Sequence, residues 1–413
     1  MTEQAKGPLA GIKVLDVTAN LAGPAAAMHL ADFGADVIKV ERPDGGDATR
    51  RFVPPIKGES SSFMMINRNK RGIAIDLKNE VGNAIFRRMV KGSDVLVENF
   101  LRETMPKLGL GYEDLRDINP SLIYLAVSGF GATGPYSHRA GVDLIAQGMS
   151  GLMSVTGYGP DHPPLKSGAP ICDVMTGMFG AMGVLAALQH RNNTGEGQFV
   201  DTSLFESGIA ASFHQSSQYV ATGKAPEALG NVHPLNGPYE VFKASDGWMT
   251  LSAGSDRHWL RLCKIIGRED LGDDPRFAKT PERMANLDQV RDILAPHFIL
   301  KTRAEWGPIF EEAGLPSGPI LDTAEMHQNE QARHRGMIVE VEHSSVGEID
   351  TLGPAVKLSK SPTSVRRAAP RLGEHGSEVL AEFGFSEAEV SGFIRDGVIS
   401  VPEPVAQAAE YGG

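Results

Sequence analysis

The chain has 413 residues, of which 41% are hydrophobic and 7% aromatic, and this length favours two domains over a single core. Its 51 acidic and 40 basic residues give a net charge of −11 at pH 7, which argues against nonspecific nucleic-acid binding. Two cysteines, Cys172 and Cys263, do not make a disulfide framework. We find no apolar signal region and no segment near the about 18 apolar residues of a membrane helix, so we expect a cytoplasmic protein without a membrane partner.

The first 41 residues predict a strand, a helix and a second strand. Residues 12–17 are apolar and β-branched, which indicates a buried strand. The helix is predicted at 24–34, with Pro24 in its first turn and Gly34 at its end, and the second strand at 36–41. This order predicts a Rossmann-like, doubly wound parallel sheet in an α/β protein. The turn after the first strand lacks G-x-G-x-x-G, which disfavours a nicotinamide-dependent oxidoreductase.

Strands and helices continue to alternate up to about residue 205. The pattern then changes to that of a small α+β domain, in which helices follow a hairpin whose turn is Ser245–Gly247. Further strands are predicted at 73–77, 94–97, 122–127 and 198–203, and helices at 80–91, 103–108, 112–118, 142–150, 174–190, 204–221, 256–266, 286–298 and 303–313.

These elements predict a discontinuous large domain. Residues 1–205 form its first part, 206–227 a linker, 228–330 the small domain, and 331–413 a return segment that completes the large domain. The return segment predicts two short strands and two amphipathic helices. The second of these helices starts at a capping box of Ser386 and Glu389, and the tail after Val401 is predicted to fray.

The strongest chemical signal lies at Asp173, just ahead of the helix predicted at 174–190. Gly177, Gly180 and Gly183 recur every three residues, so they form a stripe of small residues that lets a backbone or a ligand approach closely. An aspartate at a helix start is most often an N-cap, and this pattern alone favours that interpretation. The alternative is a carboxylate nucleophile that the helix N-terminus keeps ionised for attack on an activated acyl group.

The sequence around Asp173 resembles the central motif of the family III CoA-transferases, which include formyl-CoA:oxalate and carnitine CoA-transferases. The residues Thr176–Met178 (TGM) and Thr194–Gln198 (TGEGQ) match that motif, and the resemblance covers nearly the whole chain. It implies that Asp173 is the nucleophile, that CoA and acyl-CoA are substrates, and that no cofactor is permanently bound. It also implies an interlocked, ring-like homodimer. No metal site is predicted, because the histidines are scattered without HExxH or paired CxxC motifs.

The resemblance further implies a set of positions that contact CoA. Arg42 would hold a phosphate with its forked guanidinium, and Lys78 would add charge near the nucleotide. Lys107 stands where some relatives carry arginine. The implied set is Leu21, Ala22, Arg42, Ile75, Lys78, Asn99, Phe100, Lys107, Arg139 and Asp143, with Gly254 and Ser255 in a loop over the substrate.

Two other functions stay open at this point. The α-methylacyl-CoA racemases of the same superfamily place a catalytic histidine before the acid that matches Asp143, but Val142 stands there and cannot accept a proton, which favours transfer over racemisation. A non-catalytic CoA-binding protein is the second alternative. Leu21 replaces a glutamine that contacts oxalate in formyl-CoA enzymes, and Gly254 is the one glycine of the loop. We therefore expect succinyl-CoA or a similar donor and a carboxylic acid acceptor.

Overall fold

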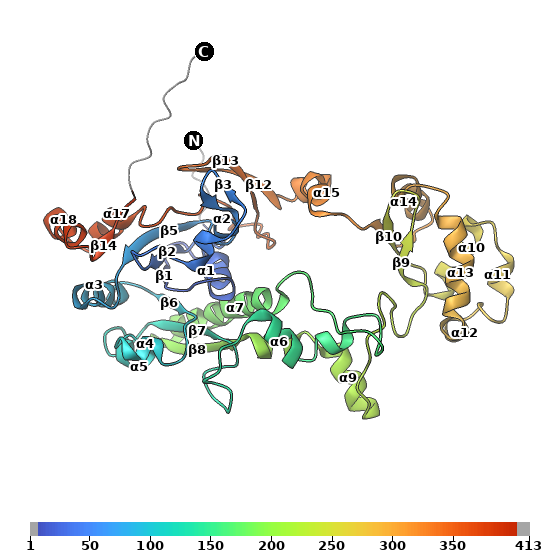
Figure 1. Ribbon diagram of the computed structural model, residues 1–413, viewed down its shortest axis with the longest axis horizontal. Helices are drawn as coiled ribbons and strands as arrows, with labels where there is room; N and C mark the ends of the chain where they lie inside the picture. Colours follow the sequence, from blue (N-terminus) through green and yellow to red (C-terminus); the bar gives the residue numbers. More distant parts are fainter. Residues whose placement is uncertain (1–6, 403–413) are drawn as a thin grey trace, which may run out of the picture. The chain divides into compact units, whose positions relative to one another are not determined.

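The computed structural model describes residues 7–402 (Figure 1). Within this part of the chain, contacts define two compact units. The first unit comprises the residues up to Leu152, Lys166–Ser216 and the residues from Glu330 onwards, and the second comprises Met153–Leu165 and Ser217–Asn329. Residues 153–165, which the sequence prediction assigned to the large domain, therefore group with the second unit.

The first unit is built on a seven-stranded sheet with the order β14-β5-β2-β1-β6-β7-β8. Every neighbouring pair is parallel except β14 and β5. The predicted doubly wound order is confirmed, because β1 lies inside the sheet and successive strands extend it in both directions. Of the strands in this sheet, only β14 was not predicted from the sequence. The strands are β1 (Lys13–Asp16), β2 (Asp36–Glu41), β5 (Lys70–Ile75), β6 (Val95–Glu98), β7 (Ile123–Ser128), β8 (Gln198–Ser203) and β14 (Ile399–Ser400).

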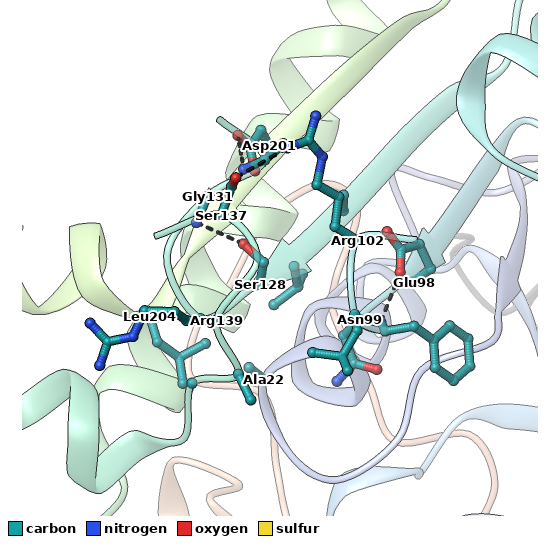
Figure 2. Close-up of a pocket in the computed structure, with 18 of the residues that line it drawn as sticks. Ala22, Glu98, Asn99, Arg102, Ser128, Gly131, Ser137, Arg139, Asp201 and Leu204 are labelled. Atoms are coloured by element: carbon teal, nitrogen blue, oxygen red, sulfur yellow. Dashed lines mark hydrogen bonds between the residues drawn. The ribbon is translucent and has the colours of Figure 1, made fainter. Parts of the chain in front are cut away.

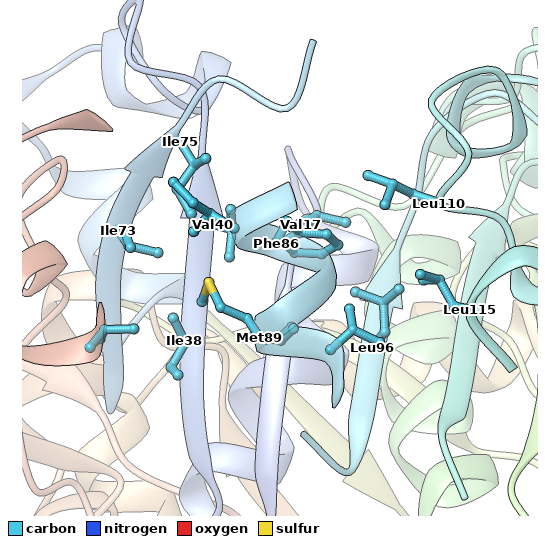
Figure 3. Packing of buried hydrophobic residues seen from close by; sticks show 14 of the residues in the cluster. Val17, Ile38, Val40, Ile73, Ile75, Phe86, Met89, Leu96, Leu110 and Leu115 are labelled. Atoms are coloured by element: carbon cyan, nitrogen blue, oxygen red, sulfur yellow. The ribbon is translucent and has the colours of Figure 1, made fainter. Parts of the chain in front are cut away.

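Apolar side chains pack on both faces of this sheet. On one face, Phe86 and Met89 of α3 pack in a cluster with Ile38, Val40 and Ile73 of the strands (Figure 3). A second cluster joins α1 and α7 to the other face. The helices of this unit are α1 (Ala22–Asp32), α2 (Ser61–Ile66), α3 (Glu80–Lys91), α4 (Thr104–Lys107), α5 (Tyr112–Arg116), α6 (Asp143–Met149), α7 (Ile171–Thr194), α8 (Leu204–Ala210), α16 (Glu330–His334), α17 (Gly376–Glu382) and α18 (Glu387–Arg395), with 3-10 turns η1 (Ala48–Arg51) and, in the second unit, η2 (Met153–Val155).

The glycine stripe of α7 packs against α1 and the sheet. A Cβ on Gly177 would lie 2.6 Å from Cβ of Ala25 in α1, and one on Gly183 would lie 2.8 Å from a methyl group of Val200. The predicted close approach is confirmed, and the partner along this stripe is protein backbone and side chain. One correction follows: α7 is long and apolar enough to cross a membrane by length and composition, contrary to our expectation that no segment comes near this, although a core helix passes the same test.

The second unit has a three-stranded antiparallel sheet and a helical layer. Its core is centred on aromatic residues, including Trp259, Phe298 and Trp306. The predicted hairpin is confirmed, with Ala244 N–H donating to Gly247 O across the turn. The helix predicted at 204–221 is instead two helices, α8 and α9. The elements are β9 (Tyr239–Lys243), β10 (Trp248–Ser252), β11 (Ser317–Pro319), α10 (Asp256–Ile265), α11 (Asp270–Asp273), α12 (Thr280–Ala285), α13 (Leu287–Phe298), α14 (Arg303–Glu312) and α15 (Thr323–Gln328), with α9 (Phe213–Thr222) starting in the first unit.

The two strands and two helices predicted in the return segment are present as the hairpin of β12 (Ile338–His343) with β13 (Gly347–Leu352) and as α17 and α18. The segment also contains β14, which was not predicted. A second small hairpin of the first unit, β3 (Pro55–Ile56) with β4 (Glu59–Ser60), lies outside the return segment. The capping box is confirmed, because Ser386 Oγ accepts from Glu389 N while the Glu389 carboxylate accepts from Ser386 N at 2.7 Å. Most of the tail predicted to fray lies outside the described residues.

Candidate active site

Two cavities lie where strands of the first unit end at their carboxyl edge, which is where open α/β sheets bind ligands. We call the first, of about 760 Å³, the Asp173 pocket (Figure 2). We call the second, of about 670 Å³, the Arg42 pocket. Of the residues implied by the sequence, Leu21, Ala22, Asn99, Phe100, Arg139, Asp143 and Asp173 line the Asp173 pocket, whereas Arg42, Ile75, Lys78 and again Phe100 line the Arg42 pocket.

Asp173 is the third residue of α7, so the interpretation of Asp173 as the N-cap is wrong. The helix starts at Ile171, and Pro170 at the N-cap position offers no side-chain acceptor. Asp143, the first residue of α6, supplies the acceptor instead. Its Oδ1 accepts from the backbone N–H of Cys172 at 2.9 Å and of Asp173 at 3.3 Å. The cap therefore comes from a segment 30 residues away in sequence.

The pKa of Asp173 is raised to about 7, first by burial and then by the charge of Asp143. This corrects the expectation that the helix N-terminus keeps the carboxylate fully ionised. A helix terminus stabilises an anion by only about 0.3–1 kcal/mol, which is less than the about 1.4 kcal/mol that moves a pKa by one, so burial prevails. A carboxyl group balanced between its two protonation states in a cavity is typical of a functional site.

Asn99 binds backbone rather than projecting freely into the pocket. Its Nδ2 donates to Ala19 O at 2.7 Å, and its Oδ1 accepts from Ala19 N at 2.9 Å. The side chain therefore joins the end of β6 to the loop that follows β1. The next residue, Phe100, lies between the two pockets and lines both.

Sequence reasoning missed several charged residues of the Asp173 pocket. The pKa of Glu98 is raised to about 7 by burial, with a further contribution from Asp201. Arg102 and Asp201 also line this pocket, and Arg102 donates to Ser137 Oγ at 3.1 Å (Figure 2). Glu98 directly precedes the matched Asn99, Arg102 follows the matched Phe100 by two residues, and Asp201 follows the matched Gln198 by three. All three positions lie beside matched motif residues, so they could have been included.

Arg139 is a basic residue of the pocket whose guanidinium carbon lies 4.8 Å from the ring centre of Tyr136 and 5.2 Å from that of Phe130. Such stacking orients a guanidinium while leaving its N–H groups for an anion. Lys107, in contrast, lies on α4 and is not among the lining residues of either pocket.

Gly254 and Ser255 belong to the second unit. Ser255 caps α10 by accepting from His258 N, and Gly254 O accepts from the hydroxyl of Thr280 and the guanidinium of Arg283 at 3.0 and 2.8 Å. This turn is thus held by side chains of its own unit. Among the described residues, no group of three or more histidines, cysteines or acids is placed to hold a metal ion.

Comparison with known proteins identifies the family of this chain. The model of CoA-transferase family III matches residues 9–376. The chain belongs to CoA-transferase family III. The activity of this family is the transfer of CoA between acids, with acyl-CoA as a substrate and no bound cofactor. The resemblance inferred from the motif around Asp173 is therefore confirmed.

Relatives that are named for different acid substrates have similar sequence identity to this chain. A succinate–glutarate CoA-transferase of Agrobacterium fabrum is 42% identical over 384 residues, covering 91% of this chain and 96% of the relative. An acetyl-CoA:oxalate CoA-transferase of Acetobacter aceti is 40% identical, covering 93% and 98%. The crystal structure of a CAIB/BAIF family protein from Brucella suis is 37% identical, with a TM-score of 0.85 and coverage of 92% and 100%.

Proposed function

We propose that this enzyme transfers CoA from succinyl-CoA or a similar donor to a carboxylic acid, with Asp173 as the nucleophile. The observation that carries the proposal is the Asp173 carboxyl group in a cavity of about 760 Å³, with its pKa raised to about 7. Near neutral pH about half of the groups are ionised, and burial makes the ionised form a stronger nucleophile than an exposed aspartate.

The proposed reaction has four balanced steps. The Asp173 carboxylate attacks the donor thioester carbonyl and CoA thiolate leaves, which forms a mixed anhydride. The thiolate attacks the aspartyl carbonyl, which releases the donor acid and forms an aspartyl-CoA thioester. The acceptor carboxylate then displaces CoA thiolate to form a second anhydride, and the thiolate attacks the acceptor carbonyl, which restores the Asp173 carboxylate and yields the new acyl-CoA.

Two backbone N–H groups at the start of α7 are already occupied and are not free as oxyanion donors. Backbone N–H groups at a helix start can stabilise an oxyanion when they have no other acceptor. Here the N–H groups of Cys172 and Asp173 donate to Asp143. Asp143 thus holds the backbone of Asp173 and contributes to the raised pKa of its carboxyl group.

The two pockets suggest how acyl-CoA is divided between them. In this proposal the Arg42 pocket takes the nucleotide end, where Arg42 and Lys78 offer positive charge to phosphates. The pantetheine arm passes Phe100, which lines both pockets, and the thioester reaches Asp173. Arg139, oriented by its aromatic neighbours, would hold the second carboxylate of a dicarboxylic acceptor.

The similarity of this chain to its relatives does not distinguish between acceptor acids as sharply as we expected. Leu21 and the single Gly254 argued against oxalate, yet a relative named as an oxalate CoA-transferase is nearly as similar as one named for glutarate. We therefore place both short and longer dicarboxylic acids among the acceptors to be tested.

A mass-spectrometric screen tests this function. Purified protein receives succinyl-, acetyl-, formyl- or oxalyl-CoA with pools of carboxylic acids, and new acyl-CoA masses identify the pair. The Asp173→Asn variant should lower the exchange rate on the order of 10⁴-fold or more, because an amide is not a nucleophile here. Exchange by this variant at a near-normal rate would contradict the role of Asp173.

We also propose that two chains form the homodimer implied by the family resemblance. Val174, Met178 and Met182 recur every four residues on α7, and they are 37%, 47% and 57% exposed in the single chain. An apolar row of this kind beside the pocket is typical of a covered interface. Light scattering that gives the mass of one chain would contradict the proposal.

A further inference from the structure

We propose that Asp47 is a positioning residue that couples the Arg42 pocket to the Asp173 pocket, so that the nucleotide end of acyl-CoA accelerates transfer at the thioester end. The inference rests on the proposed function, in which the Arg42 pocket takes the nucleotide. It concerns two segments at the carboxyl edge of the sheet. We call residues 18–21 the β1 loop and residues 42–47 the β2 loop.

One carboxylate joins these two loops. Oδ1 of Asp47 accepts from the backbone N–H of Asn20 at 3.2 Å and from that of Thr49 at 2.9 Å. Asn20 lines the Asp173 pocket, whereas Asp47 lines the Arg42 pocket. Asn20 also adopts a left-handed backbone conformation (φ 64°), which few side chains other than glycine and asparagine tolerate, so the β1 loop is held in one specific shape.

The second oxygen of Asp47 faces a fully buried lysine. Oδ2 lies 3.2 Å from Nζ of Lys39, and neither side chain is exposed. The same Nζ donates to Thr18 O in the β1 loop at 2.9 Å. A buried ion pair is weak evidence for stability, because desolvation offsets most of the attraction. The contacts of this ion pair indicate that it positions the β1 loop, because Lys39 and Asp47 each form a hydrogen bond with that loop.

The β1 loop is fixed at successive residues by different elements. Thr18 is held by Asp16 and Lys39, Ala19 by Asn99, and Asn20 by Asp47. The β2 loop in turn contains Arg42, whose Nε donates to O of Gly46, the residue before Asp47. A phosphate that fixes the position of Arg42 therefore also fixes the β2 loop at Asp47. Through its hydrogen bond with Asn20, Asp47 then fixes the position of the β1 loop in the wall of the Asp173 pocket.

This arrangement suits an enzyme that uses remote binding energy to raise its turnover rate. Binding of a non-reacting part of the substrate raises kcat only if it improves the geometry at the reacting centre. A displacement of reacting groups by about 1 Å can change a rate on the order of 100-fold. A shift of this size in the β1 loop, after loss of its hydrogen bond to Asp47, would therefore produce a measurable change in kcat.

The test compares acyl-CoA with the corresponding acyl-pantetheine, which lacks the nucleotide. In the wild-type enzyme, truncation should lower kcat on the order of 100-fold, in addition to its effect on KM. Two matched variants both remove the buried ion pair, namely Lys39→Met with Asp47→Asn and Lys39→Met with Asp47→Ala. Only the asparagine keeps an oxygen that can accept from Asn20 N–H.

We expect the asparagine variant to retain most of the kcat ratio between the two substrates and the alanine variant to lose it. A general loss of stability would lower both rates but would not change their ratio. If the ratio is the same in the wild type and both variants, the inference is overturned. If the wild type exchanges no CoA with any acyl-CoA, the proposed function fails instead, so the two failures are distinguishable.

A second measurement needs no variant. Adenosine 3′,5′-bisphosphate added in trans should raise the kcat of the wild-type enzyme for acyl-pantetheine about tenfold, because it refills the Arg42 pocket. Circular dichroism establishes whether each double variant is folded. If neither variant folds, an unchanged kcat on addition of the nucleotide overturns the inference by itself.

Discussion

At the scale of single residues, the pair of Asp143 and Asp173 explains how a buried carboxyl group is tuned. Asp143 accepts two backbone N–H groups at the start of α7 and the side-chain amide of Gln147, so its own negative charge is satisfied. Asp173 has no such support, and burial together with the charge of Asp143 raises its pKa to about 7. Two acids in one site therefore have different roles.

The first prediction concerns the pH dependence of activity. If the ionised form of Asp173 is the nucleophile, as proposed, kcat/KM should rise with pH through about 7. Asp143→Asn removes a negative charge but keeps an oxygen for the α7 cap, so the pKa of Asp173 should fall and the rising limb should move to lower pH. Initial rates in buffers from pH 5 to 9 measure this, and an unmoved limb would exclude the charge of Asp143 as a cause.

The second prediction concerns stability. The folded-state pKa of Asp173 is about 7 against 3.8 for the free group, so ionisation is penalised in the folded state. The penalty is absent below about pH 4, grows as the pH rises to about 7, and is constant above that. Asp173→Asn removes it. The melting temperature of the variant should therefore exceed that of the wild type by a margin that is larger at pH 8 than at pH 4.5, as measured by differential scanning fluorimetry.

At the scale of elements, the packing of α7 on α1 determines the position of Asp173. The glycine stripe lets the two helices approach until backbone atoms nearly touch, since a Cβ on Gly177 would also lie 3.1 Å from Ala22 O. Ala22 lines the Asp173 pocket. The same close approach that buries α7 thus sets the distance between Asp173 and the end of the β1 loop.

The third prediction tests this packing. Gly177→Ala should destabilise the protein by about 1–3 kcal/mol, because the new methyl group overlaps Ala25 and neither helix backbone can yield easily. Gly307→Ala in α14 is the matched control: a Cβ there meets nothing within 4 Å, so we expect stabilisation by about 0.5–1 kcal/mol. Urea denaturation measures both, and equal effects of the two variants would refute the packing argument.

At the scale of the whole molecule, the exposed row on α7 bears on assembly. α7 contacts α1 and the sheet on one side, while Met178 and Met182 remain about half exposed in the single chain. Exposure of this much apolar surface is costly, at about 25 cal/mol per Å². A second chain that covers the row would explain why the helix is apolar nearly all round.

The fourth prediction follows from this row. Met178→Glu should convert a dimer to monomers or weaken it by at least about tenfold, because a carboxylate would be buried without a partner. Val81→Glu, at a similarly exposed apolar position in the first turn of α3, should leave the mass unchanged. Analytical ultracentrifugation of both variants separates a specific interface from a general effect of added charge.

The sequence by itself determined the order of strands and helices, the membership of Asp173 in a known motif and the close approach at the glycine stripe. These features depend on local periodicity and on residues adjacent in the chain, which a sequence records directly. Even so, local signals misplaced the start of α7 by three residues, because its first-turn N–H groups are capped by Asp143, which no pattern near Asp173 could reveal.

Only the tertiary structure decided how these residues act together. Three features depend on distant segments that exclude water and share hydrogen bonds: the division of the proposed CoA-binding residues between two pockets, the raised pKa of Asp173, and the link from Asp47 to Asn20. Desolvation and charge–charge energies are set by the positions of atoms in space. Spacing along the chain does not specify them until the sheet has brought its strand ends together.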